Sequence, residues 1–239
     1  MPRMLSTKET VKIKSISKYG LANTPLKNIN GYMGVSICSH FYSKKNVTAI
    51  IEWASKTFHT FLFLIADEPQ TYTFLSSKGL NFNDSYSKAM MIGDEKFAFI
   101  KRLIDTSFYS NIKIVRWQDI AHNTSFLTTR KEIVNCYQND NNFKNDVLKQ
   151  VSHRNEILST ADEILQINKY NFDIAAKYVL NEIAVMIYLQ EIAENTFPIQ
   201  VYPSQMPTCL AGLYENMYFS NIGLNREKSG YIEIEVNAA

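Results

Sequence analysis

The run TFLFLIA, from Thr60 to Ala66, is the feature that most limits how this chain of 239 residues can fold. Side chains alternate between the two faces of a strand, so an uninterrupted apolar run predicts a strand that is covered on both faces. Asp67-Glu68-Pro69 follows directly and predicts the end of that strand. Strands of this kind are typical of parallel sheets that carry helices on both faces.

Strand and helix patterns alternate along most of the remaining chain. Further strands are predicted at Gly31–Ile37, Ile112–Trp117, Ile199–Tyr202 and Tyr231–Val236, the last of them at an edge of the sheet. Helices are predicted at Val47–Phe58, with Asn46 as its cap, and at Asp94–Tyr109, Ser125–Asn139, Phe143–Leu158 and Asp173–Asn195. This alternation predicts βαβ units and an α/β fold with a mostly parallel sheet flanked by helices.

The whole chain, 1–239, is predicted to be a single domain. Apolar residues make up 46% of it, which is enough for one well-buried core, and no internal repeat or long Gly/Ser linker divides it. Residues 1–28 are predicted to form a loose N-terminal arm, and the closing Asn-Ala-Ala, 237–239, resembles a cloning remnant.

No segment of the sequence predicts export or insertion into a membrane. The N-terminal residues mix charges with isolated apolar side chains and lack the apolar core of a signal peptide. The longest mainly apolar run is shorter than the ~18–20 residues needed to span a bilayer. Cys38, Cys136 and Cys209 are widely spaced and predict no disulfide framework. We therefore expect a cytoplasmic protein that does not insert into membranes.

Several common functional motifs are missing from the sequence. It holds no GxxxxGK[ST] phosphate loop, no GxGxxG after the first strand, and no HExxH or CxxC. The four histidines are scattered, and Cys38 with His40 is more simply read as an incidental pair than as a catalytic one. We therefore expect no cofactor and no metal. The net charge of +2 neither requires nor excludes a nucleic-acid partner.

Ser36, in Gly34-Val35-Ser36, lies where the first strand gives way to a polar loop and is a candidate nucleophile. Ligands of open α/β sheets bind beyond the carboxyl ends of the strands, and Gly34 would let a substrate approach the backbone. The pattern is weak, because it lacks the second glycine of a hydrolase nucleophile elbow. On the pattern alone, a serine that ends a strand or caps a helix is the stronger interpretation.

Tyr178, Glu182 and Tyr202 are candidates for proton transfer. Tyr178 and Glu182 are four residues apart on a predicted helix and therefore share a face. If that face is buried, the pKa of an unpaired Glu182 would rise toward the range of a general base, whereas a partly exposed glutamate at the rim is the alternative. Tyr202 closes a strand before Pro203 and either points into the same crevice or packs in the core.

Basic residues gather around the helix predicted at Asp94–Tyr109. Along one helix face they could contact phosphates, but an ordinary solvated face explains them equally well, since acidic residues dilute the charge. The candidate RNA-binding residues are Lys88, Lys96, Lys101 and Arg102.

Taken together, these candidates resemble the cyclodipeptide synthase family. The resemblance rests on GVS at Ser36, on YVLNE from Tyr178 to Glu182 in a long helix, and on VYP around Tyr202 about twenty residues later. It extends from about residue 31 to residue 235. The resemblance implies a Rossmann-like domain similar to the catalytic domains of class I tyrosyl- and tryptophanyl-tRNA synthetases. It also implies an enzyme that joins amino acids from two aminoacyl-tRNAs into a cyclic dipeptide, and that is a monomer.

The resemblance also assigns roles to individual residues. Ser36 matches the nucleophile that carries the acyl group. Tyr178 and Glu182 match the pair that holds the substrate amino group, with Glu182 also a proton acceptor. Tyr202 matches a proton relay in ring closure, and the basic helix matches the one that binds the first tRNA. One branch of the family has Asn three residues after the nucleophile; Ser39 stands there in this chain, which favours the branch that keeps only Tyr-Pro.

The expected substrate-binding residues lie around Gly34 and on neighbouring elements. They predict an apolar pocket and hence an apolar first amino acid. The residues are Tyr32, Gly34, Ser39, Phe63, Ile65, Met186 and Ile199.

Three other functions remain open from the sequence. A synthetase-like ligase on the same fold would need HIGH-like and KMSKS-like segments for ATP, and neither is present. A non-catalytic tRNA-binding domain would explain the basic helix but not the four candidate catalytic residues in family order. A serine esterase would need a histidine partner and a second glycine near the serine.

Overall fold

The computed structural model describes residues 9–17, 21, 23–77, 80–158, 171–193, 196–218 and 229–238, without the side chains of 9, 153–158 and 238. The described residues form a six-stranded sheet in the order β1-β6-β5-β2-β3-β4. Its strands are β1 (Glu9–Ser17), β2 (Gly31–Ser36), β3 (Phe61–Ala66), β4 (Ile112–Arg116), β5 (Ile199–Tyr202) and β6 (Gly230–Ala238). Strands β6, β5, β2, β3 and β4 run parallel to one another, whereas β1 runs antiparallel to β6. The predicted α/β class is therefore confirmed.

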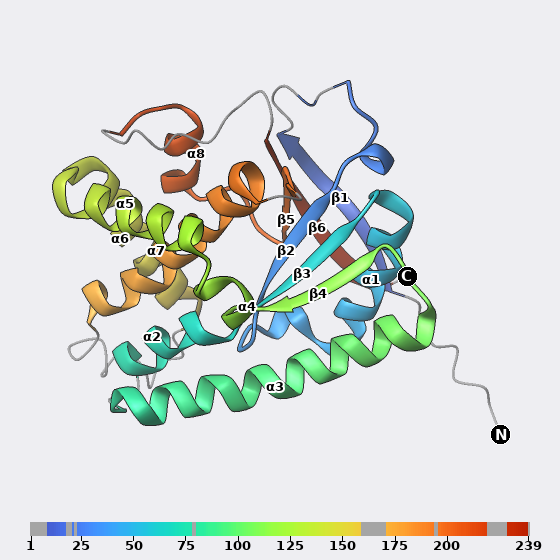
Figure 1. The fold of residues 1–239 in the computed structure, drawn as a ribbon, viewed down its shortest axis with the longest axis horizontal. Helices are drawn as coiled ribbons and strands as arrows, with labels where there is room; N and C mark the ends of the chain where they lie inside the picture. Colours follow the sequence, from blue (N-terminus) through green and yellow to red (C-terminus); the bar gives the residue numbers. More distant parts are fainter. Residues whose placement is uncertain are drawn as a thin grey trace.

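Helices cover both faces of this sheet. They are α1 (Lys44–Thr57), α2 (Asp67–Ser77), α3 (Phe82–Ser107), α4 (Gln118–Ala121), α5 (Thr124–Asn139), α6 (Asn141–Leu158), α7 (Phe172–Ile187) and α8 (Thr208–Tyr214). A π-helical turn, Tyr188–Ile192, continues α7. Figure 1 shows α5, α6, α7 and α8 gathered on one side of the molecule, while the long α3 runs past the β4 end of the sheet.

The side chains of β2 and β3 alternate between two separate hydrophobic clusters. Tyr32, Leu62 and Leu64 belong to the cluster under α5 to α8, which also contains much of α7. Met33, Val35, Phe61, Phe63 and Ile65 belong to the cluster under α1 and α3. Because alternate residues of a strand share a face, Gly34 and Ser36 lie on the same face as Tyr32, toward α7.

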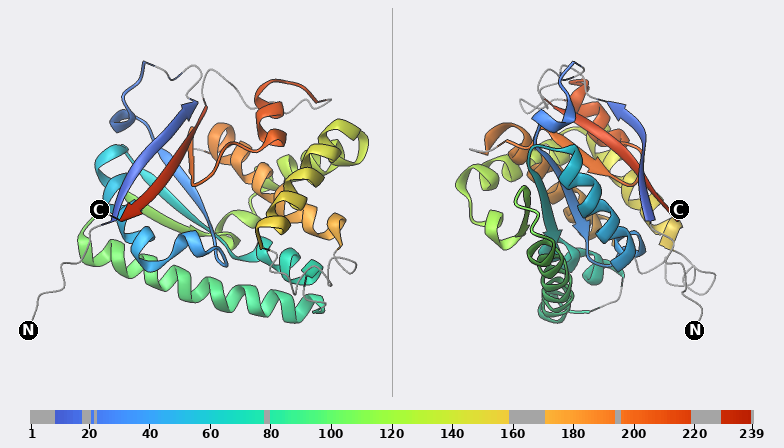
Figure 2. Two further views of the ribbon diagram at one scale, coloured as in Figure 1. Left: turned by 180° about the vertical axis from the view of Figure 1, so that it is seen from behind. Right: turned by 90° about the vertical axis from the view of Figure 1, so that its right-hand side faces the viewer.

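The predicted loose arm is wrong for residues 9–17, which form β1. They pair with β6 along its length, and both views of Figure 2 show the two strands together at the sheet edge opposite β4. β6 is consequently an inner strand between β1 and β5, not the edge strand that its alternation suggested. Val11 and Ile13 pack against the cluster under α1, and the pattern then breaks at a register shift between Ile13 and Ser15. Residues 1–8 of the expected arm lie outside the described residues.

One helix begins earlier than its apolar pattern indicates, and another was not predicted. α3 starts at Phe82, not at Asp94, because the Asn81 side chain accepts a hydrogen bond from the Asp84 N–H at 2.9 Å and caps it there. Asp67-Glu68-Pro69 follows the end of β3, as predicted, and also begins α2, a helix that the sequence did not predict. Acidic residues favour the first turn of a helix, and proline is tolerated there because its missing N–H would have no intrahelical partner.

Smaller differences concern caps and ends. Ser43, not Asn46, caps α1, since its Oγ accepts from the Asn46 N–H at 3.3 Å. α8 was not predicted, and the predicted end of the long helix at 195 lies outside the described residues. Asn237 and Ala238 extend β6, opposite Thr10 and Glu9.

Two further observations concern the described residues. No helix among them is long and apolar enough to cross a membrane. The three cysteines, all within the described ranges, form no disulfide.

Candidate active site

Ser36 is the last residue of β2, at the carboxyl end of the parallel strands. It is half-buried and lies opposite Ala66 of β3. Two residues earlier, a Cβ built on Gly34 would have no neighbouring atom within 4 Å. Open space therefore lies on the face of β2 that Ser36 shares, directly beside the serine. Gly34 therefore leaves the backbone of β2 uncovered beside Ser36, which is the opening expected of a glycine at this position.

The turn that follows Ser36 is held to the strand by hydrogen bonds. Ser39 N–H donates to the Ser36 carbonyl at 3.3 Å, and Ser39 Oγ accepts from the Phe41 N–H at 3.3 Å. The Tyr42 hydroxyl donates back to the Gly34 carbonyl at 2.7 Å. Ser39 thus caps the short helical turn His40–Tyr42, and Tyr42 ties that turn to the strand beside the open space.

Tyr42, in the turn after Ser36, lies near the other candidate residues. Burial raises the pKa of its phenol well above the ordinary value, and nearby acidic groups raise it further, in order Tyr202, Tyr178, Glu182 and Tyr231. Such electrostatic effects require proximity. The fold therefore brings residues of α7, β5 and β6 toward the end of β2. Tyr178 is buried, and Glu182 and Tyr202 are half-buried.

The predicted pocket walls are only partly right. Phe63, Ile65 and Ile199 pack in the cluster under α1 and α3, on the face opposite Ser36, so they do not line this site. Met186 is buried in the cluster under α7, on the same side as Tyr32. By strand register, the side chains that accompany Tyr32 on this face are Leu62 and Leu64 of β3 and Gln200 of β5.

The four candidate RNA-binding residues differ in what they contact. The Lys96 ammonium donates to the Tyr42 carbonyl at 2.7 Å, and burial is the main cause that lowers its pKa. Lys88 lies 5.2 Å from the centre of the Phe74 ring. Lys101 pairs with Asp105 at 3.3 Å, and Lys101 and Arg102 are exposed. Lys96 therefore links α3 to the turn after Ser36. The exposed positive charges of Lys101 and Arg102 lie nearer the C-terminal end of α3.

A polar network at the ends of β3 and β4 was not predicted from the sequence. The Arg116 guanidinium contacts the Asp67 carboxylate at 2.6 Å and also contacts Asp94 of α3. The Asp67 side chain is fully buried, and that of Arg116 is only 12% exposed. A Cβ on Gly93 would come within 2.5 Å of Asp67 Cβ, so only glycine lets α3 approach this closely.

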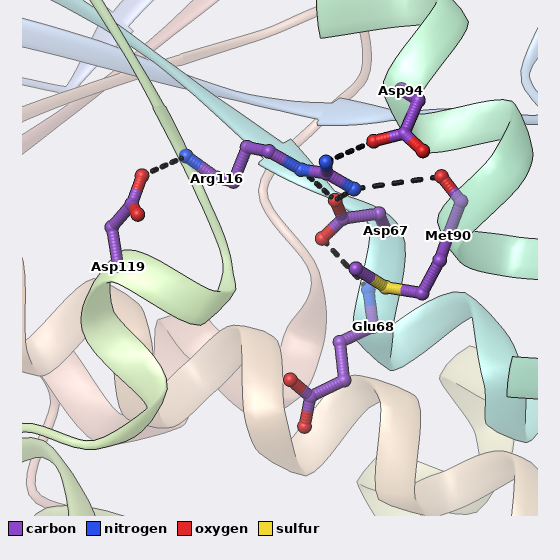
Figure 3. A network of polar contacts seen from close by, with 6 residues as sticks. All are labelled: Asp67, Glu68, Met90, Asp94, Arg116 and Asp119. Carbon is purple, nitrogen blue, oxygen red and sulfur yellow. Dashed lines mark hydrogen bonds and ion pairs between the residues drawn. The ribbon is translucent and has the colours of Figure 1, made fainter.

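Figure 3 shows how the network is arranged. Arg116 lies between Asp67 and Asp94, its Nη2 is 3.5 Å from the Met90 carbonyl, and its backbone N–H donates to Asp119 at 2.8 Å. Glu68 points away from Arg116, and burial is the main cause that raises its pKa. The network fixes α3 against the sheet. Among the described residues, no group of three or more His, Cys, Asp or Glu could hold a metal ion.

Comparison with known proteins now decides the family. The family model for cyclodipeptide synthase matches residues 30–233, which is most of the chain. The chain belongs to the cyclodipeptide synthase family. Members of this family are tRNA-dependent enzymes that make cyclic dipeptides, so the predicted enzyme class is confirmed, and the ligase, non-catalytic and esterase alternatives are not supported. The assignment to the branch that keeps only Tyr-Pro stays a prediction.

Individual relatives agree with the family assignment. The synthase is similar to cyclo(L-leucyl-L-leucyl) synthase of Staphylococcus haemolyticus (strain JCSC1435), with 25% identity over 205 residues and 84% of each protein covered. A solved cyclodipeptide synthase from Fluoribacter dumoffii gives a TM-score of 0.76 at 16% identity, covering 97% of this chain and 99% of that one.

Two further solved structures bear on the fold. A cyclodipeptide synthase from Candidatus Glomeribacter gigasporarum, bound to Phe-tRNAPhe, gives a TM-score of 0.64 at 16% identity and covers 94% and 95% of the two chains. Tyrosyl-tRNA synthetase from Archaeoglobus fulgidus gives 0.50 at 13% identity and covers 87% and 55%. The expected likeness of this synthase to class I tRNA synthetases is therefore confirmed at the level of fold.

Proposed function

We propose that this synthase uses two aminoacyl-tRNAs and carries the growing product as an ester on Ser36. The observation that supports this most directly is the open space over Gly34 beside Ser36, at the carboxyl end of β2. Parallel α/β sheets bind their ligands at this end of the strands. The relative whose structure holds Phe-tRNAPhe has the same fold over nearly its whole length.

The first step is an acyl transfer to the serine. Ser36 Oγ attacks the ester carbonyl of the first aminoacyl-tRNA, the bond from that carbonyl to the ribose oxygen breaks, and the serine proton passes to the leaving ribose hydroxyl. An ester is already activated, so the serine needs less help than one that attacks an amide. The chemistry needs no ATP, because the activation took place when the tRNA was charged.

Three further transfers complete the ring. The amine of the second aminoacyl-tRNA attacks the Ser36 ester, which releases the Ser36 hydroxyl and leaves a dipeptidyl-tRNA. Ser36 Oγ then attacks the ester of this dipeptidyl-tRNA, the bond to the ribose oxygen breaks, the serine proton passes to the leaving ribose hydroxyl, and the dipeptide remains as an ester on Ser36. The free amine of the dipeptide then attacks this ester, releasing Ser36 and a cyclic dipeptide. Each attacking amine must be neutral, so a proton acceptor has to lie within hydrogen-bond reach.

Glu182 and the tyrosines around it are the groups that we assign to these proton transfers. Glu182 holds the ammonium of the bound aminoacyl group with Tyr178 and accepts a proton when an amine attacks. Tyr202 orients the last amine or relays its proton, because a phenol with an ordinary pKa near 10 is a poor free base at neutral pH. The raised pKa of the nearby Tyr42 phenol keeps that group protonated as a hydrogen-bond donor to Gly34.

The tRNA is proposed to approach along α3. Lys101 and Arg102 are exposed near the end of this helix and offer charge to phosphates. Charge reversal at both residues should weaken binding of aminoacyl-tRNA and reduce the slope of affinity against salt. Lys113→Glu is the matched control, since Lys113 is an exposed lysine of β4 outside the helix. An unchanged slope in the double variant would remove this helix from the tRNA footprint.

The activity is tested by mass spectrometry of medium from cells that express the synthase. A cyclic dipeptide should appear with the intact chain and vanish with Ser36→Ala. Ser55→Ala is the control, because it removes a serine of α1 outside the site, whose Oγ donates to the Glu52 carbonyl of the same helix at 2.8 Å, and it should retain product. Product made at full level by soluble Ser36→Ala protein would contradict the assignment of Ser36.

A further inference from the structure

Three polar side chains lie side by side across the sheet, on the face toward α7. In the strand register Tyr32 of β2 lies beside Gln200 of β5, which lies beside Tyr231 of β6. Tyr32 is 1% exposed, Tyr231 is 2% exposed and Gln200 is 8% exposed. Polar side chains are seldom buried this completely, and the other side chains under α7 are mainly apolar.

The hydrogen bonds of this row are incomplete. The Tyr231 hydroxyl donates to the Ser204 carbonyl at 2.8 Å. Within the described part of the chain, by contrast, the Tyr32 hydroxyl and Gln200 Oε1 are buried and have no hydrogen-bond partner. Buried polar atoms are almost always paired with protein, water or ligand, because an unpaired one loses its hydration without compensation. Two such atoms on neighbouring strands indicate that something else binds between them.

The row lies in line with the candidate nucleophile. Tyr32 and Ser36 are on the same strand and face, four residues apart, which corresponds to about 13 Å along the strand. Gly34 lies between them and leaves open space. An acyl group on Ser36 whose side chain extends along β2 would cross Gly34 and reach Tyr32 and Gln200. The sides of this path are apolar, with Leu64 beside Gly34 in the register.

We propose that the first aminoacyl group has a neutral side chain that ends in a hydrogen-bond donor, and that tyrosine fits best. This rests on the proposed acyl transfer to Ser36. Gln200 Oε1 can only accept, so the ligand must donate to it, while the Tyr32 hydroxyl can donate or accept. A phenol satisfies both atoms, and its ring suits the apolar path past Leu64. A charged end would lose its hydration against neutral partners.

This inference replaces the apolar first amino acid that the sequence suggested. That expectation relied on Phe63, Ile65 and Ile199, which lie on the other face of the sheet. It also separates this synthase from its relative in Staphylococcus haemolyticus, whose name specifies two leucyl residues, since leucine offers no group for either unpaired atom.

The test compares tyrosine with phenylalanine, which differ only in the hydroxyl. Purified synthase is mixed with Tyr-tRNA, Phe-tRNA or Leu-tRNA, and the initial rate of acyl transfer to the protein is measured for each. Transfer from Tyr-tRNA should exceed transfer from Phe-tRNA by about tenfold or more, because sites built around a substrate hydroxyl reject the analogue that lacks it. Equal rates, or faster transfer from Phe-tRNA or Leu-tRNA, would overturn the inference.

Variants give a second readout. Tyr32→Phe with Gln200→Leu should bring the ratio of tyrosine to phenylalanine transfer close to one. Tyr137→Phe is the matched control, since it removes a buried phenol that already donates to Asp173 at 3.0 Å, and its ratio should stay at the wild-type value. A double variant that transfers acyl groups with the wild-type ratio would also overturn the inference. Absence of transfer from all three tRNAs, with folded protein, would instead overturn the proposed function on which it rests.

Discussion

The two faces of the central sheet are built for different tasks. Under α1 and α3 the side chains of β2, β3 and β5 are apolar, among them Met33, Phe63 and Val201. Under α7 the same strands present tyrosines and a glutamine, and two of their polar atoms lack partners among the described residues. Close packing of apolar groups stabilises a fold, whereas unsatisfied polar groups weaken it. The difference suggests that the first face supplies stability and the second supplies the site.

The strongest test of this division compares neighbouring residues of β3. Phe63 and Leu64 are both buried, but on opposite faces. We expect Phe63→Ala to lower the free energy of unfolding by about 3–5 kcal/mol and Leu64→Ala by about 2–5 kcal/mol, through lost burial and residual cavities. Both are measured by urea unfolding. Only Leu64→Ala should change the relative transfer of different aminoacyl groups, measured on the folded fraction at low temperature. An equal change in Phe63→Ala would break the division.

The same substitution, glycine to alanine, tests the comparison between packing and site at two positions, Gly93 and Gly34. A methyl group on Gly93 would meet Asp67 Cβ at 2.5 Å and Asp67 Oδ2 at 2.8 Å, in a buried ion pair that cannot easily move. We expect Gly93→Ala to destabilise the protein by about 1–3 kcal/mol, because overpacking outweighs the gain in helix propensity.

The companion substitution is Gly34→Ala. Its methyl group meets nothing within 4 Å, so thermal unfolding should be nearly unchanged, while acyl transfer to Ser36 should slow because the methyl group occupies substrate space. A Gly34→Ala protein that keeps full transfer activity would show that the space over Gly34 is not used.

The smallest expected effect concerns Glu68, which packs beside α7 away from the Arg116 network. Burial raises the pKa of its carboxyl above the ordinary value, so the ionised form is disfavoured in the folded state. Stability from this group is present below the ordinary pKa and falls as pH rises through the window between the unfolded and the folded pKa. Glu68→Gln should therefore stabilise the protein at pH 7, by less than about 1 kcal/mol since the group is partly exposed. Unfolding at pH 7 and at pH 4 measures it, and a gain that is larger at pH 4 would contradict this account.

The positions of β2, β3, β4 and β5 along the chain could be predicted from the sequence to within about a residue at each end. Strong apolar runs and the residues that end them are local signals. It could not show which side chains of β3 face the site. FLFLIA is apolar at every position, so no polar face marks its orientation, and Phe63 and Ile65 were placed on the wrong side. β1 was missed because its alternation breaks at the register shift after Ile13.

The polar links around the site depend on contacts between distant parts of the chain. Arg116 and Asp67 are 49 residues apart, and Lys96 reaches the Tyr42 carbonyl across 54 residues. No local pattern predicts such pairs. Lys96 resembled a phosphate-binding residue in the sequence because only its charge and helical position were visible there, whereas its half-buried ammonium donates to a backbone carbonyl.

The most direct test of the account is to observe the acyl group on Ser36. Purified synthase is mixed with one aminoacyl-tRNA that carries a labelled amino acid, quenched in acid, digested and analysed by mass spectrometry. We predict one added aminoacyl mass on the peptide that contains Ser36, and none in Ser36→Ala protein treated in the same way. A label on any other residue, or cyclic dipeptide formation by Ser36→Ala at the wild-type rate, would contradict the account.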